Sequence, residues 1–208
     1  TVTSVDVGEH PIVSGMAEGR PELVGLALWL CAERIKGASS EWAAYVRTLR
    51  ANPDAPLFWT EDEDFALLKG SPIAGDVIER AKSAREEYAS IVEIIRNDPQ
   101  SYPVDAYEFF TEERFVDALA TVCAKATWLP TASCYAMVPL LDIINVVGSP
   151  VPGVRPPSAN DGVARCGPAD YDIDTACVVL NTTTKAPVNS EVVQIDVLQR
   201  NNGELFLN

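Results

Sequence analysis

Residues 112–138 read EERFVDALATVCAKATWLPTASCYAMV, and the periodicity of the sequence changes within this stretch. Up to residue 127 the apolar residues, such as Phe115, Leu119 and Val122, recur three or four positions apart, as in a helix. After Pro130 the segment 134–138 is short and apolar, which is typical of a strand. The stretch therefore predicts a helical part of the chain that ends near Pro130 and a β part that follows it.

Upstream of this stretch, four further segments have helical spacing. Pro21 suits a first helical turn and Gly37 a terminator, while Thr60 and Glu63 have the spacing of a capping box. The aromatic stripe that begins at Trp42 is more often core than a ligand site. The predicted helices lie at about 21–36, 40–49, 60–70 and 71–97.

Downstream, the sequence predicts a small β region. Residues 139–145 read as a turn or short helix, and 148–168 as an exposed Pro-rich loop. Segments 175–181 and 191–198 read as strands, joined as a hairpin through 185–190. The predicted class is α+β, a mainly helical lobe followed by a small antiparallel β region, and a parallel sheet would contradict it. The expected division is an N-terminal segment 1–20, a helical lobe 21–130 and a β region 131–208.

Composition excludes several classes of function. Among 208 residues, 30 are acidic and 16 basic, which gives a net charge of −14 and leaves no basic stripe for nucleic acid. No apolar run reaches the roughly 20 residues of a transmembrane helix, so we expect a soluble protein. The acidic surface is either a solvated face or a docking surface for a basic partner.

The cysteines and the single histidine do not form a recognisable site. The five cysteines are widely spaced without a Cys-x-x-Cys pair, so we expect neither a zinc site nor a disulfide framework. Cys31, Cys123 and Cys177 lie in apolar stretches and read as core residues. His10 precedes Pro11, and we expect it on the surface or as a cap.

Generic catalytic motifs are absent from the sequence, but three blocks of it resemble one family. The first block contains Trp42-x-x-Tyr45-x-x-x-Leu49, residues 56–63 (PLFWTEDE) and residues 68–71 (LKGS). The second is residues 138–145 (VPLLDIIN), and the third is residues 201–208 (NNGELFLN). In this order, over roughly residues 21–208, they resemble SET-domain proteins of the Rubisco large-subunit lysine methyltransferase type.

The resemblance implies a helical insert within a knotted all-β SET core. It also implies methyl transfer from S-adenosylmethionine to a lysine nitrogen of a partner protein. Such a reaction needs backbone that holds the cofactor closely, carbonyl oxygens around the methyl group and an aromatic hydroxyl that orients the amine.

Measured against the family's motifs, this sequence departs at each functional point. The family's Asn-His-Ser is Asn145-Val146-Val147 here, so only Asn145 matches. The Arg of the family's Ser-Arg-Ala-Phe segment aligns with Lys125, which supplies charge without a bidentate fork. The family's Gly-x-Gly strand is not identifiable in residues 1–20, and its catalytic Tyr would follow Asn208.

We therefore expect a catalytically degenerate relative that acts as a protein-binding or structural subunit, with no catalytic residue, no metal and no cofactor. Two β-branched residues at positions 146 and 147 suit a filled, cofactor-free site. The alternative is an active protein-lysine N-methyltransferase seen as a fragment. In that case S-adenosylmethionine is the cofactor, and Asn145 and Lys125 contribute to its site.

We expect the partner to be a protein, in a large plastid assembly, and not a nucleic acid. We also expect no transmembrane segment. The acidic chain, its unpaired cysteines and a first residue Thr1 that looks processed suit import into the chloroplast stroma. The cytoplasm is the alternative compartment.

Overall fold

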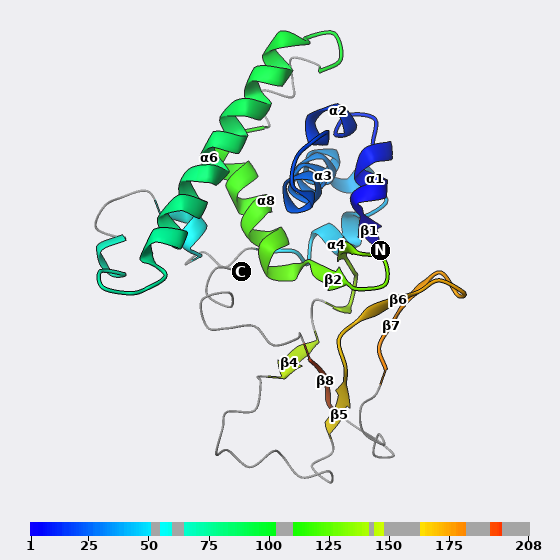
Figure 1. The fold of residues 1–208 in the computed structure, drawn as a ribbon. Coiled ribbons are helices and arrows are strands. Elements are labelled where there is room, and N and C mark those ends of the chain that lie inside the picture. The colour runs from blue at the N-terminus through cyan, green and yellow to red at the C-terminus, as the bar shows by residue number, and fades with distance from the viewer. Residues whose placement is uncertain are drawn as a thin grey trace.

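The computed structural model describes residues 1–50, 55–59, 65–102, 110–141, 144–147, 163–181 and 192–196. The described helices gather in one lobe, and strands β4 to β8 lie beside it (Figure 1). The helical elements are α1 (Ser4–Glu9), α2 (Ser14–Ala17), α3 (Glu22–Lys36), η1 (Gly37–Ser39), α4 (Ala43–Val46), η2 (Pro56–Phe58), α6 (Ala74–Asn97) and α8 (Glu112–Lys125).

Helix α3 lies at the centre of this lobe. Its sequence is apolar on nearly every side, and α1, α2, α4 and α8 all contact it. Leu26 and Leu30 of α3 and Phe115 and Val122 of α8 are completely buried in the resulting core. Each such side chain stabilises the fold by about 1.5–3 kcal/mol through burial. Gly37, with φ of 57°, ends α3 as predicted.

Of the remaining helix predictions, those for the segments 71–97 and 112–127 are confirmed, whereas in the described part of the predicted helix 60–70 only residues 65 and 66 are helical. Helices α6 and α8 match the expected segments, and the buried stripe of α6 faces the core with Val77, Ala84 and Ile91 among its members. The segment after Ser40 forms only the short helix α4, whose neighbour Trp42 packs edge-on against Trp29 at 5.9 Å. Residues 60–64, which include the predicted capping box, lie outside the described residues.

The N-terminal residues 1–20 begin with a strand and continue as helices. Strand β1 (Val2–Thr3) is followed at once by α1, because the backbone N–H of Thr3 donates to the Asp6 carboxylate at 2.8 Å and caps the helix. The helical lobe therefore starts at Ser4, earlier than the predicted boundary at residue 21.

A three-stranded antiparallel sheet forms the base of the lobe, in the order β1-β3-β2. Strands β2 (Thr127–Leu129) and β3 (Cys134–Met137) follow α8 directly, and β3 is the predicted strand. Met137 belongs to the core of the helical lobe, whereas Ala136 and Val138 belong to a second, smaller core. The sheet thus separates two apolar clusters, because successive residues of a strand point to opposite faces.

The predicted hairpin between the last two strands is wrong. Strand β7 (Cys177–Val179) pairs instead with β6 (Asp170–Asp172), antiparallel. The carboxylate of Asp172 accepts the N–H groups of Asp174 and Thr175, and Ala176 takes a left-handed φ of 53°. These contacts close a tight turn before β7, so its partner is the preceding strand.

Strand β8 (Val192–Asp196) is the centre of a parallel sheet in the order β4-β8-β5. Its partners are β4 (Asn145–Val147) and β5 (Val163–Cys166), and β5 occupies residues that the sequence assigned to the Pro-rich loop. The predicted α+β class is confirmed, but the β region is mixed and not antiparallel throughout. Alternation of apolar residues identifies a strand but not its partner, which is why the pairing could not be predicted.

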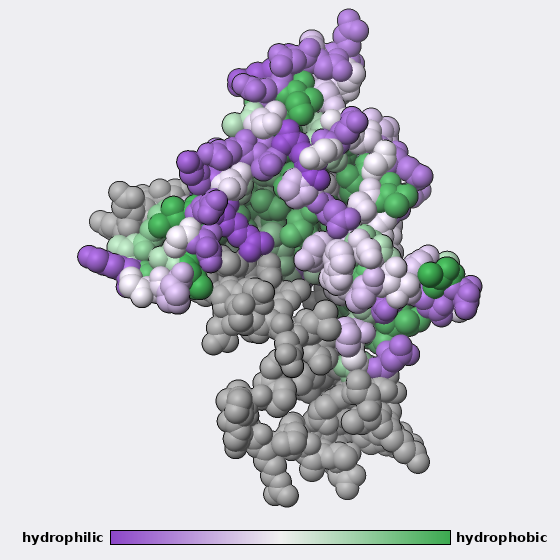
Figure 2. Space-filling view, in the orientation of Figure 1, coloured by the Kyte–Doolittle hydropathy of each residue, from purple (hydrophilic) through white to green (hydrophobic). Residues whose placement is uncertain are grey.

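The surface of the lobe follows the helical patterning. Figure 2 shows hydrophilic residues along the outer side of α6 and apolar residues on its inner side. Among the described helices, none combines the length and the apolar character that crossing a membrane requires.

Candidate functional site

Lys125 is the last residue of α8 and is half-buried. A basic residue in the last turn of a helix interacts favourably with the negative end of the helix dipole. This contribution explains a cation here without a ligand. Lys125 stands two positions before β2, which starts at Thr127.

The segment that leads from β3 to β4 is held by apolar contacts. Val138 and Leu141 are buried in the second core, and Ile144 packs against it. The N–H of Leu141 donates to Val138, and that of Ile144 donates to Leu141, at 3.2 and 3.1 Å. Leu140, which lies between Val138 and Leu141, is 73% exposed and has a φ of 73°, an unfavourable conformation for a leucine. The chain reverses there so that its neighbours can point inward.

Asn145, the other predicted site residue, is the first residue of β4 and pairs in register with Gln194 of β8. Val146 and Val147 continue the ladder opposite Ile195 and Asp196. The side chains of β4 lie outside the described part of the structure. That Lys125 and Asn145 share a cofactor site therefore stays a prediction.

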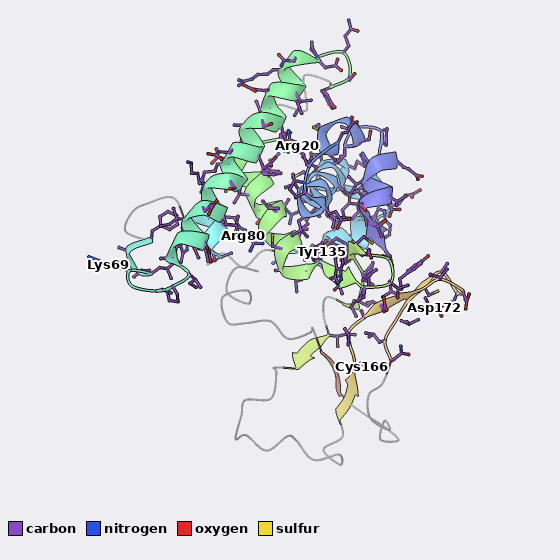
Figure 3. The ribbon with its side chains drawn as sticks, viewed as in Figure 1. Arg20, Lys69, Arg80, Tyr135, Cys166 and Asp172 are labelled. Carbon is purple, nitrogen blue, oxygen red and sulfur yellow. The ribbon has the colours of Figure 1, made fainter. Side chains whose placement is uncertain are left out.

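A contact that the sequence could not indicate joins the helical lobe to β3. The carboxylate of Glu22, at the start of α3, accepts the backbone N–H of Tyr135 at 3.1 Å. Strand β1 pairs with Met137 and Ala136 of β3 and then turns into α1, so it ends before it reaches Tyr135. The Glu22 carboxylate therefore supplies the acceptor that a further residue of β1 would have offered to the Tyr135 N–H. Tyr135 itself packs edge-on against Trp128 of β2 at 5.1 Å and lies at the base of the lobe (Figure 3).

A second missed contact holds the turn between β2 and β3. The carboxylate of Asp170 accepts both the N–H and the hydroxyl of Thr131 at 2.8 Å. The hydrogen bond from the Thr131 backbone, with those from its hydroxyl and from Tyr171, lowers the pKa of Asp170. Hairpin β6–β7 is thereby attached to the β2–β3 turn, and Asp172 lies at its outer part (Figure 3).

His10 is buried and belongs to a polar cluster with Glu33, Lys36 and Ser40, which corrects its expected place on the surface. Its Nδ1 atom accepts the N–H groups of Ile12 and Val13 at 3.3 and 3.2 Å, so the expected capping role is confirmed. Nε2 lies 3.4 Å from the Glu33 carboxylate and 3.0 Å from the Lys36 ammonium.

The pKa values in this cluster are shifted by burial and by charge. Burial, and next the Lys36 ammonium, lower the pKa of His10 against the effect of Glu33. Burial raises the pKa of Glu33, but hydrogen bonds from Lys36 and Ser40 outweigh it, so the net shift is downward. The groups of the cluster satisfy one another, which is typical of a structural network.

All five cysteines are free thiols, and they differ widely in exposure. Cys31 and Cys123 are core residues as predicted, but Cys177 is exposed on β7, contrary to expectation. Cys166, on β5, is buried (Figure 3). Within the described ranges, no group of three or more His, Cys, Asp or Glu residues is arranged to hold a metal ion.

No protein-family model matches the chain. An actin-histidine N-methyltransferase of Danio rerio is 32% identical over 126 residues, which are 59% of this chain and 21% of that protein. Those of Mus musculus and Homo sapiens are 29% identical over the same length. The chain spans about a fifth of the length of these curated relatives.

A solved structure resembles nearly the whole chain. The SET domain of LSMT bound to lysine and AdoHcy has a TM-score of 0.67 and 20% identity, and it covers 99% of this chain and 44% of that one. At this identity the likeness shows the fold. Together with the similarity to actin-histidine N-methyltransferases, it confirms the predicted resemblance: the chain has the fold of a SET domain, and part of its sequence is similar to protein methyltransferases.

Proposed function

We propose that the chain is a catalytically degenerate relative of Rubisco-type protein-lysine methyltransferases that serves as a protein-binding or structural subunit. The observation that carries this proposal is the register of β4. Val146 and Val147, which stand where the family has His and Ser, occupy consecutive ladder positions opposite β8. Two β-branched residues in a strand suit a packed sheet and bring no polar side chain to a ligand.

The residues of this chain fit S-adenosylmethionine only in part. Asn145 matches the family's motif, and Lys125 offers a positive charge at the end of α8. A lysine ammonium is a point charge, whereas an arginine holds a carboxylate with two parallel hydrogen bonds.

The alternative function is an active S-adenosylmethionine-dependent protein N-methyltransferase, of which this chain is one segment. The similarity to actin-histidine N-methyltransferases and the fold of a SET domain bound to AdoHcy favour this alternative. Its acceptor would be a lysine or histidine side chain of a partner protein.

Thermal unfolding of the full-length protein with increasing S-adenosylmethionine distinguishes the two. A ligand that binds only the folded state adds roughly 2.7 kcal/mol at 100 times its Kd, which is a clear rise in Tm. The degenerate protein is expected to show no dose-dependent rise and no transfer of a labelled methyl group to protein. A rise that Lys125→Met and Asn145→Ala both abolish would establish the active alternative.

For the partner we propose a protein of a large plastid assembly, and for the compartment the chloroplast stroma. Free cysteines in a chain of this size suit a reducing compartment. A fluorescent fusion of the full-length precursor is expected in plastids, and a uniformly cytosolic signal contradicts the proposal. The Pro-rich loop predicted at 148–168 is the proposed contact with this partner. Replacement of residues 151–162 by a Gly/Ser linker should therefore weaken association in a pull-down while sparing β5, which begins at Val163.

A further inference from the structure

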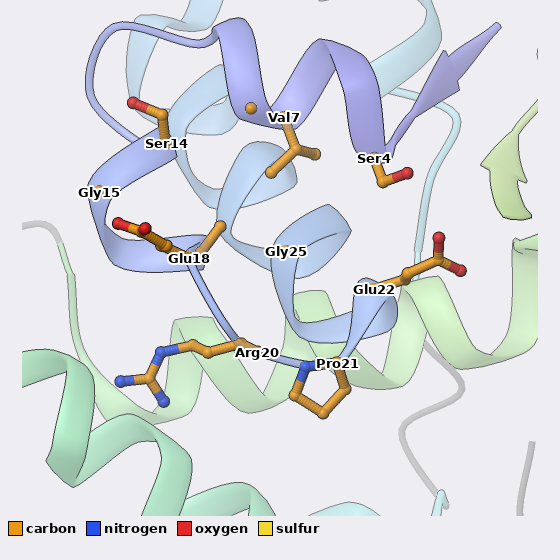
Figure 4. A pocket seen from close by; sticks show the side chains of 11 residues that line it. Ser4, Val7, Ser14, Gly15, Glu18, Arg20, Pro21, Glu22 and Gly25 are labelled. Atoms are coloured by element: carbon orange, nitrogen blue, oxygen red, sulfur yellow. The ribbon is translucent and has the colours of Figure 1, made fainter.

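A pocket of about 430 Å³ lies between α1, α2 and the start of α3, on the helical lobe (Figure 4). Small residues build much of it, because α1 and α3 approach each other closely where Gly25 faces Val7. Gly8 also lines it, and a Cβ added there would meet no atom within 4 Å. The volume is within the usual range of pockets that receive a small ligand or a side chain.

The charges around this pocket are predominantly negative. Residues 1–25 contain four acidic residues, Asp6, Glu9, Glu18 and Glu22, against the single basic residue Arg20. Glu18 and Glu22 line the pocket and extend to opposite sides of it (Figure 4), but the Glu22 carboxylate also accepts the backbone N–H of Tyr135. Glu18 is exposed, and among the described contacts its carboxylate has no hydrogen-bond or ion-pair partner.

Arg20, the basic residue among those lining the pocket, does not offset this charge inside it. Its guanidinium is directed toward α6, where it bonds the carboxylate of Glu87 and the hydroxyl of Ser90. Its Nε donates to the carbonyl of Met16 at 2.8 Å. The stem of Arg20 therefore forms part of the wall, while its charge is neutralised by Glu87.

Apolar wall atoms accompany these carboxylates. Val7, Ala17 and Pro21 line the pocket, and the hydroxyls of Ser4 and Ser14 lie at its edges (Figure 4). An alkyl chain that ends in a cation fits both features, because its stem buries apolar surface and its head remains near carboxylate and solvent.

We propose that this pocket receives the cationic side chain of a lysine or arginine presented by a partner polypeptide. Asp6 and Glu9 lie on the outer side of α1 and are exposed, so further basic residues of the same polypeptide would meet acidic surface beside the pocket. The proposal concerns binding alone and is independent of whether the protein transfers methyl groups.

The test uses NMR titration of the full-length protein with Nα-acetyl-lysine N-methylamide and its arginine counterpart. The backbone amide signals of Gly8, Gly15 and Gly25 report on the pocket. Both cations are expected to shift these signals with Kd values on the order of millimolar, and 0.5 M salt should weaken binding severalfold. The neutral norleucine derivative, with the same stem and no charge, should shift them weakly.

Two pairs of variants separate the pocket from the rest of the fold. Gly8→Leu should abolish the shifts by filling the pocket, while Gly75→Leu, at another helical glycine with no atom within 4 Å, should leave them unchanged. Glu18→Gln should weaken binding by about fivefold, in line with the loss of one exposed charge contact. Glu9→Gln, outside the pocket lining, should weaken it less.

Three outcomes overturn the proposal. The first is an absence of shifts at 50 mM of either cation, at roughly ten or more times the expected Kd. The second is equal binding of norleucine and lysine derivatives, which would remove the role of charge. The third is tight binding of cadaverine with none of the amino-acid derivatives, which would make a free diamine the ligand.

Discussion

The carboxylate of Glu22 bonds the backbone N–H of Tyr135 at the point where β1 leaves the first sheet. The two residues are 113 positions apart in the sequence, and the bond joins the first turn of α3 to the central strand β3. Beyond β3 the chain passes through the turn at Leu140 to Asn145. Glu22 thus supports the strand from which the candidate cofactor segment departs.

Glu22→Ala should lower the free energy of unfolding by about 1–2 kcal/mol, because it leaves the Tyr135 N–H without its acceptor and removes a favourable charge from the helix start. Glu22→Gln retains an acceptor oxygen and should lose less. Urea unfolding measures both. The control is Glu113→Ala, an exposed first-turn position of α8, which should cost a few tenths of a kcal/mol. Equal losses at positions 22 and 113 would show that the bond to Tyr135 contributes nothing.

The Arg20–Glu87 ion pair should contribute more to stability than the exposed Lys82–Glu86 pair of α6, the helix that also carries Glu87. The Arg20 side chain is 12% exposed and that of Glu87 is 31% exposed, whereas Lys82 and Glu86 are 74% and 64% exposed. A double-mutant cycle with Arg20→Met and Glu87→Gln should give a coupling of about 1–2 kcal/mol. The matched cycle with Lys82→Met and Glu86→Gln should give less than about 0.5 kcal/mol. Similar couplings in both cycles would contradict the expected effect of burial.

Stability should rise as the pH increases from about 5 to 7, and His10 should be responsible. Because burial and the Lys36 charge lower its pKa in the folded state, the unfolded chain binds more protons over this range. The stability contribution is complete above the unfolded pKa and is lost as the pH falls through the folded one. The lowered pKa of Glu33 acts in the same direction at more acidic pH.

His10→Asn retains an acceptor for the N–H groups of Ile12 and Val13 and removes the titrating ring. Urea unfolding of this variant at several pH values should therefore show a flatter profile between pH 5 and 7 than the parent protein. An unchanged slope would assign the pH dependence to other groups.

The five thiols should react in an order set by exposure. Burial raises the pKa of Cys31 to about 12, with smaller effects from neighbouring charges, and burial also raises that of Cys123. A thiol reacts as its thiolate, so both should resist alkylation at pH 8 until the protein unfolds. Exposed Cys177 should be modified first, as peptide mass mapping after maleimide treatment would show. Labelling of Cys31 in the folded protein as fast as Cys177 would contradict the described packing.

The resemblance to a SET-domain protein could be read from three blocks of sequence, and the fold confirms it. For the candidate site, the sequence predicted which residues belong to it but not the contacts that hold them. Asn145 and Lys125 follow from alignment to the family's motifs. No local sequence pattern, however, indicates that Glu22 bonds β3 or that Asp170 bonds the β2–β3 turn. Acidic residues of this kind are common on every surface, so their partners cannot be inferred without coordinates.

The sequence alone determined which segments form the long helices and located their ends to within three residues. Helices α3, α6 and α8 follow from apolar residues at helical spacing and from terminators such as Gly37, because these signals act within a few neighbouring residues. Tertiary structure alone decided the strand partners. Strand β7 pairs with β6 and β8 joins β4 and β5 in parallel, since a strand satisfies its hydrogen bonds with whichever neighbour the surrounding packing brings beside it.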